Sequence, residues 1–267
     1  VYCSYNGRGF LRHVLIRAAG NTDDIMCVIV GAAREFPEKR EFTRRLMKRC
    51  PGITSLYFSV SSSEKMVTGG CMERLWGKEH LEDIICGKKF AISPGSFAQV
   101  NPVQAEVLYE LAIKYADIKS TDTVIDAYCG IGTLTALAAE RAKYVYGCEI
   151  NETAVMDGQE NLRINGIGNA RIVCEDSGRF MEEFRGGGLA ADVVILDPAR
   201  AGCDRRFLAN LVQIAPKRIV YVSCNPESQA RDVFYLVQRG YKLKKLSPVD
   251  MFPWTGHVEC VGLLYKV

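Results

Sequence analysis

Apolar and polar positions follow two different patterns along the chain. In residues 1 to about 95, short β-rich runs surround one amphipathic stretch, which predicts a small α/β region. Strands are expected at residues 13–17, 25–30 and 53–60, a helix at 38–50, a loop at Ser61, Ser62 and Ser63, and a polar, mixed stretch to about residue 90.

From Pro102 onward the pattern predicts a strict alternation of helix and strand. The run at residues 192–196 is apolar, as a parallel strand covered on both faces requires. We predict the α/β fold class, a doubly wound, Rossmann-like domain at residues 96–267 preceded by a small α/β subdomain at 1–95. Strands are expected at residues 123–128, 144–149, 170–173, 192–196, 218–222, 241–246 and 258–265, and helices at 104–115, 133–141, 152–164, 207–214 and 227–239.

The composition is that of an ordinary globular chain, with 48% hydrophobic and 24% charged residues among 267. The sequence has no run of 18 or more apolar residues, so we expect no transmembrane helix. Residues 1–5 show no basic segment followed by an apolar stretch, so we expect no signal peptide. We therefore expect a cytoplasmic monomer with no membrane partner. Because Val1 is neither an initiator Met nor the start of an element, we expect the chain to begin inside a longer protein.

The eleven cysteines form no C-x-x-C pair. This spacing argues against a zinc ribbon and a compact disulfide framework, and we expect no metal site. We expect mostly buried, inert thiols in a reducing compartment, so a reactive cysteine must be argued from its surroundings.

The net charge of +3 and the pI of about 8.3 are compatible with nucleic acid without indicating it. Residues 34–49 are more basic, with seven Lys or Arg against three Glu. Taken alone this segment is best explained as a solvated helix face, and the alternative is contact with phosphates.

A ligand loop is expected after the strand at residues 123–128, because Gly130 and Gly132 precede a helix N-terminus. Glu149 ends the next strand, 17 residues after Gly132, where a carboxylate can accept ribose hydroxyls. A tight turn without ligand is the lesser alternative. Thr135 stands where the dinucleotide fingerprint needs a third glycine, which disfavours an NAD enzyme.

Two further loops leave neighbouring strand ends, Asp197-Pro198-Ala199-Arg200 and Ser223-Cys224-Asn225-Pro226. These stretches resemble the RNA uracil-5-methyltransferase family, which includes bacterial 23S rRNA and tRNA 5-methyluridine enzymes. The resemblance rests on five motifs in the family's order: residues 96–102, 126–133, 196–200, 222–226 and 250–259.

The resemblance implies roles for eight residues. S-adenosyl-L-methionine would be the cofactor, Cys224 the nucleophile that attacks carbon 6 of the uracil, and Glu259 the base that removes the proton from carbon 5. A buried thiol and a solvent-facing strand residue are the structural alternatives for these two, and a raised pKa is expected for Glu259. The cofactor contacts implied are Gln99, Tyr128, Gly130, Thr133, Glu149 and Asp197.

Ala199 departs from the family, which usually has a second proline there. Many members also carry an N-terminal β-barrel that binds RNA, and some an iron–sulfur cluster; we see neither and expect the barrel to precede Val1. RNA is the expected partner, with 23S rRNA favoured over tRNA because residues 13–20 and 93–102 resemble the rRNA group more closely. A methyltransferase of exocyclic amines and a non-catalytic binding module are the other classes.

Overall fold

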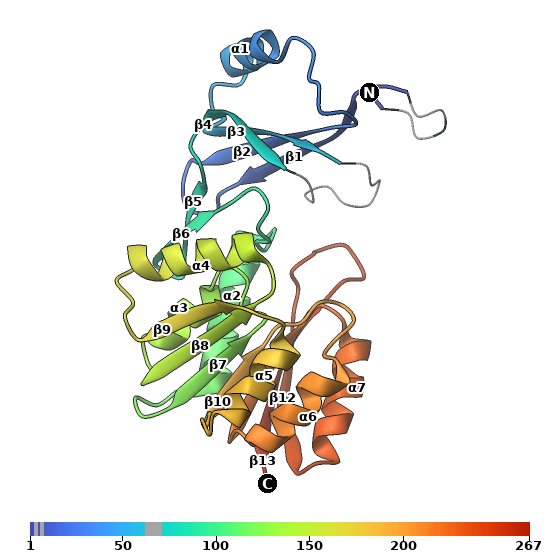
Figure 1. The fold of residues 1–267 in the computed structure, drawn as a ribbon. Coiled ribbons are helices and arrows are strands. Elements are labelled where there is room, and N and C mark those ends of the chain that lie inside the picture. Colours follow the sequence, from blue (N-terminus) through green and yellow to red (C-terminus); the bar gives the residue numbers. More distant parts are fainter. Residues whose placement is uncertain (3–4, 6–7, 62–70) are drawn as a thin grey trace. The chain divides into compact units, whose positions relative to one another are not determined.

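The structure is a computed structural model that describes residues 1–2, 5, 8–61 and 71–267. The chain divides into two compact units, Val1–Val100 and Asn101–Val267 (Figure 1). The sequence analysis places the boundary between residues 95 and 96. The loop expected at Ser62 and Ser63 lies outside the described residues.

The described part of the first unit contains one helix and six strands: β1 (Leu11–Ala18), β2 (Ile25–Gly31), α1 (Lys39–Arg49), β3 (Ser55–Val60), β4 (Met72–Gly77), β5 (Leu81–Ile85) and β6 (Lys88–Ile92). One sheet has the order β1-β2-β3-β4, and β5 and β6 form a separate hairpin. β2 and β3 are parallel, because α1 connects them, whereas β1 and β4 are antiparallel to their neighbours. Phe42 and Leu46 of α1 pack against a buried cluster that includes Leu56 and Phe58 of β3.

The expectation of a polar, mixed stretch to about residue 90 is wrong, because β4, β5 and most of β6 lie there. β4 is an edge strand whose side chains are partly or fully exposed, and among the described residues β5 and β6 pair only with each other. Such strands carry charged side chains and therefore lack the apolar run that identifies a central strand.

The second unit contains seven strands and six helices. These are α2 (Pro102–Ala116), β7 (Thr123–Ala127), α3 (Thr133–Ala139), β8 (Tyr144–Glu149), α4 (Glu152–Ile164), β9 (Ala170–Cys174), α5 (Ser177–Gly186), β10 (Val193–Leu196), α6 (Arg205–Ile214), β11 (Arg218–Ser223), α7 (Pro226–Val237), β12 (Tyr241–Val249) and β13 (Glu259–Lys266).

The sheet of the second unit has the order β12-β13-β11-β10-β7-β8-β9. Neighbours from β11 to β9 are parallel, and β13 is antiparallel to both its neighbours. One layer of helices contains α2, α3 and α4, and the other α5, α6 and α7, so the sheet is covered on both faces (Figure 1). Strand order reverses between β7 and β10, which is where ligands bind in doubly wound sheets.

The sequence analysis missed α5 between β9 and β10. Asp176 caps this helix, and Phe180, Met181 and Phe184 join the core around β10 and α6. The helix is short, contains charged residues and has glycine near both ends, so its apolar stripe is weak in the sequence.

The expectation of mostly buried cysteines is wrong for the described chain. Four of its ten cysteines are buried, and all ten are free thiols. Cys50, Cys71 and Cys174 are exposed, whereas Cys224 is half-buried. Within the described ranges, no helix is long and apolar enough to cross a membrane.

Candidate functional site

The loop from β7 to α3 has an unusual backbone. Tyr128, Gly130 and Gly132 have φ angles of 63°, 54° and 80°. A Cβ added at Gly130 would meet no atom within 4 Å, so this backbone borders open space. A Cβ at Gly132 would lie 2.6 Å from Cδ1 of Ile172. One glycine therefore leaves room for a ligand, while close packing requires the other.

Glu149 ends β8 beside this loop and is half-buried. Its Oε2 accepts a hydrogen bond from the backbone N–H of Gly130 at 3.1 Å, and its Oε1 accepts one from Asn151 at 2.8 Å. Each carboxylate oxygen keeps a further lone pair for an incoming hydroxyl. The backbone thus holds the carboxylate in position, and its binding of ribose hydroxyls stays a prediction.

Asp126 lies fully buried in β7, and the sequence analysis gave it no role. Its Oδ2 accepts a hydrogen bond from Oγ1 of Thr135 at 2.6 Å, and its Oδ1 has no partner within the described structure. Burial raises the pKa of Asp126 to about 7, an effect that the nearby Glu149 charge strengthens. A buried, half-satisfied carboxyl group is costly to keep, so it marks this strand end as a candidate site.

Asp197 follows β10, across the switch point from the β7 loop. Its backbone N–H donates to the carbonyl oxygen of Ala127 at 3.3 Å, which extends the parallel pairing by one residue. Burial raises the pKa of Asp197 to about 7, and the charges of Glu259 and Asp126 contribute. Asp197 thus lies close enough to both carboxylates for their charges to interact.

Cys224 follows β11 directly and is half-buried. Oγ of Ser223 accepts from the N–H of Asn225 at 3.1 Å and donates to its carbonyl oxygen, so these residues close a tight turn around Cys224. Nδ2 of Asn225 donates to the carbonyl oxygen of Arg200 at 2.9 Å. The loops after β10 and β11 are therefore tied together, with Cys224 between them.

Glu259 is the first residue of β13 and is only 3% exposed. Ser223 pairs with Cys260 in the antiparallel register, so Cys224 and Glu259 come next at the same end of the two strands. Burial raises the pKa of Glu259, and Arg200 partly offsets that rise. The burial and the raised pKa expected from the sequence are both present; the role as base stays a prediction.

The charges around Cys224 oppose its ionisation. Burial raises the pKa of the Cys224 thiol, and the carboxylates of Glu259 and Asp197 raise it further. Arg200 acts in the opposite direction. The site therefore holds a protonated thiol at neutral pH, and any change that neutralises either carboxylate favours the thiolate.

Helix α7 fixes the geometry of both loops through a buried carboxylate. Oδ2 of Asp232, which is 1% exposed, accepts from the N–H of Cys203 at 2.8 Å and from the hydroxyl of Tyr221 at 2.7 Å. Arg231 pairs with Asp232 and donates to the carbonyl oxygen of Ala201. The segment after Arg200 is thus anchored to β11 and α7.

Three other residues proposed as cofactor contacts have different surroundings. Tyr128 is half-buried, and its ring packs against Phe207 of α6 with 5.3 Å between ring centroids. Thr133 is buried as the first residue of α3. Gln99 belongs to the first unit, two residues before Asn101.

The structure thus brings Asp197, Cys224 and Glu259 together, and it places Gly130 and Glu149 on the neighbouring strand ends. Sequence reasoning included Asp126 and Arg200 in the motifs but assigned them no role, and it missed Asp232. Asp126 has a sequence signal, since it is the one charged residue inside an otherwise apolar strand. A thiol, a buried carboxyl group and an open glycine loop can together support covalent catalysis on a bound ligand.

The fold and this arrangement define a doubly wound α/β domain with a candidate ligand site at its switch point. Comparison with known proteins specifies the family. The model of the tRNA (uracil-5-)-methyltransferase family matches residues 78–267. The chain belongs to this family.

Relatives and a solved structure agree with this assignment. An uncharacterized RNA methyltransferase of Halalkalibacterium halodurans is 43% identical over 96% of this chain, and one of Oceanobacillus iheyensis is 44% identical over 98%. The chain spans 56% and 58% of their lengths. The tRNA (uracil-54, C5)-methyltransferase of Pyrococcus abyssi, solved with S-adenosyl-L-homocysteine, is 31% identical with a TM-score of 0.79, over 99% of this chain and 62% of that one.

Proposed function

We propose that this chain is the catalytic part of an S-adenosyl-L-methionine-dependent enzyme that methylates carbon 5 of a uridine in RNA. The observation that carries the proposal is the position of Cys224 and Glu259 at the same end of β11 and β13. Uracil-5 methylation needs a nucleophile and a base on one pyrimidine ring, and this pair supplies both. Methylation of an exocyclic amine would need neither.

The residues at the switch point fit a nucleoside cofactor. Open space borders Gly130, the Glu149 carboxylate is fixed beside it, and Asp126 has a buried oxygen without a partner in the described structure. Glu149 would accept the ribose hydroxyls, and Asp197 would lie against the part of the cofactor nearest Cys224. When bound, the cofactor supplies an electrophilic methyl group.

Cys224 acts on the uracil ring. Its thiol loses a proton to water, and the thiolate forms a bond to carbon 6 while the ring electrons move to the carbon 5 enolate. That enolate carbon is the nucleophile that would accept the methyl group, which the bound cofactor would supply. Because Glu259 and Asp197 raise the pKa of Cys224, we expect the thiolate to be generated only in the loaded site.

Glu259 completes the reaction. Its carboxylate takes the proton from carbon 5, the ring double bond returns, and Cys224 leaves carbon 6 as a thiolate. A raised pKa makes the Glu259 carboxylate a stronger base than an exposed glutamate, which suits this step. The uridine must be unstacked to reach both residues.

For the RNA class we propose 23S rRNA, on the resemblance of residues 13–20 and 93–102 to the rRNA group. The similarity to a tRNA (uracil-54, C5)-methyltransferase supports tRNA as the alternative. Methyl transfer to each RNA, followed by mapping of 5-methyluridine, decides between them.

The chemistry is tested with RNA that carries 5-fluorouridine. Fluorine at carbon 5 does not leave as a proton, so the adduct with Cys224 should persist as a shifted band on a denaturing gel. Cys224→Ala should abolish the band, whereas Cys174→Ala, which removes an exposed thiol, should leave it. With ordinary RNA, Glu259→Gln should accumulate the same adduct. Methyl transfer at full rate by Cys224→Ala would refute the covalent route and support amine methylation.

A further inference from the structure

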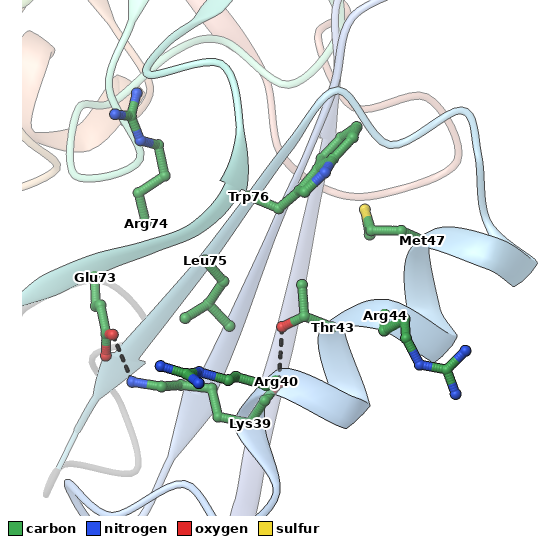
Figure 2. A pocket seen from close by; sticks show the side chains of 9 residues that line it. All are labelled: Lys39, Arg40, Thr43, Arg44, Met47, Glu73, Arg74, Leu75 and Trp76. Atoms are coloured by element: carbon green, nitrogen blue, oxygen red, sulfur yellow. Dashed lines mark hydrogen bonds and ion pairs between the residues drawn. The ribbon is translucent and has the colours of Figure 1, made fainter.

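A groove of about 500 Å³ lies between α1 and β4 in the first unit (Figure 2). Four of its lining side chains are cationic and one is acidic. The others are apolar or neutral and include Trp76, one of two tryptophans in the chain. The groove therefore combines a positive charge with an aromatic ring.

A β-bulge in β4 determines which of its side chains face α1. Trp76 pairs with Leu56 and Glu73 pairs with Phe58, and the register shifts between them, so Leu75 is the extra residue. Leu56 and Phe58 belong to the core cluster against which Phe42 and Leu46 of α1 pack, and directly opposed residues share a face of the sheet. Trp76 is thus held on the α1 side, where 44% of it stays exposed.

The cations of α1 line the other side of the groove. Lys39 forms an ion pair with Glu73, and Arg44 pairs with Glu41. Arg40 is exposed and makes no ion pair within the part of the chain that the structure describes. Surface pairs are weak, so these side chains stay available to a stronger anion such as a phosphate.

We propose that this groove binds a single-stranded segment of RNA, with Trp76 stacked on an unpaired base and Arg40 and Arg44 on phosphates. The proposal rests on the proposed function and specifies where the substrate is held beyond the catalytic site. A positive groove with an exposed ring is how proteins bind single strands without reading their sequence. The ring favours a nucleic acid over an acidic protein segment, which would need only the charges.

The two tryptophans allow each unit to be followed separately. Trp76 belongs to the first unit, and Trp254 lies fully exposed in the second. Trp254→Phe leaves Trp76 as the only tryptophan, and Trp76→Phe leaves Trp254. Excitation at long wavelength, where the twelve tyrosines absorb little, then reports on one tryptophan at a time. An unstructured single-stranded oligoribonucleotide should quench the emission of Trp76, because stacking on a base brings the ring into contact with it.

Each substitution in the groove should weaken RNA binding in the way that the proposed role of the side chain predicts. Trp76→Ala should lower RNA affinity about tenfold, the range expected for one stacked base. Arg40→Gln should reduce the slope of log K against log salt concentration by about 0.7, because this is the contribution of one phosphate contact to a single strand. Lys48→Gln removes the same charge from α1 outside the groove and should change affinity less than twofold. Circular dichroism confirms that each variant is folded.

The outcomes separate this proposal from the proposed function. If RNA changes the emission of Trp254 but not that of Trp76, and methyl transfer still occurs, RNA binding in the groove is refuted. The proposed methyltransferase function then stands. Quenching of Trp76 without any 5-fluorouridine adduct would support the groove and refute the chemistry. Loss of affinity in Arg40→Gln but not in Trp76→Ala would show a merely electrostatic surface and would also overturn the proposal.

Discussion

At the scale of the residue, the charges around Cys224 predict whether a substitution speeds or slows the reaction of its thiol. The Glu259 carboxylate raises the pKa of the thiol and Arg200 lowers it. At pH 8, Glu259→Gln should therefore speed alkylation of Cys224 by iodoacetamide, and Arg200→Gln should slow it. Mass spectrometry of the Cys224 peptide gives the rate, with exposed Cys174 as internal reference. Slower alkylation in Glu259→Gln would contradict the electrostatic account.

A second prediction concerns the buried carboxyl group of Asp126. Because its folded pKa is raised from 3.8 to about 7, its protonated form stabilises the fold below about pH 4, and this contribution is lost as the pH rises through 7. Asp126→Asn keeps an acceptor for the Thr135 hydroxyl without the charge. Relative to the wild type, its free energy of unfolding should rise by about 4 kcal/mol between pH 4 and 8. Urea unfolding at several pH values measures this difference, and parallel pH profiles would exclude it.

At the scale of the element, the β7–α3 loop separates a packing glycine from a ligand glycine. Gly132→Ala combines a positive φ with a Cβ 2.6 Å from Ile172, so we expect a loss of about 3 kcal/mol in stability. Gly130→Ala meets open space and should cost about 1 kcal/mol, through its backbone conformation alone.

The substitutions Gly130→Ala and Gly132→Ala also separate an effect on stability from an effect on cofactor binding. A methyl group at Gly130 would occupy the space beside Glu149, so Gly130→Ala should weaken S-adenosyl-L-methionine binding in calorimetry more than its small stability loss explains. Equal binding by the wild type and Gly130→Ala would remove this loop from the cofactor site.

Sequence patterns predicted elements that have a continuous apolar run or a clear amphipathic pattern. β10 is apolar throughout and β11 is apolar from Ile219 to Val222, so both strands were expected, and the sequence placed Cys224 and Asp197 in the neighbouring loops that follow them. β4 and α5 were missed because their apolar positions are few and interrupted by charges. The raised pKa of Asp126 was not predictable either, since it depends on burial from all sides rather than on a local pattern.

At the scale of the whole molecule, the division at Val100 and Asn101 bears on Gln99, which the family resemblance assigns to the cofactor although it belongs to the first unit. A fragment of residues 101–267 keeps the Asn101 cap of α2 and the whole seven-stranded sheet, so it should fold and bind S-adenosyl-L-methionine. If Gln99 donates one hydrogen bond, this fragment should bind about fivefold more weakly than the full chain, and Gln99→Ala in the full chain should show the same loss.

A fragment of residues 96–267 regains Gln99 without the sheet of the first unit. It should recover the affinity for the cofactor but not the affinity for RNA, because the groove between α1 and β4 is absent. Calorimetry with the cofactor and filter binding with RNA measure the two affinities on the same fragments. Equal cofactor affinity in all of them would show that Gln99 has no part in the site, and full RNA affinity in either fragment would show that the second unit alone holds the substrate.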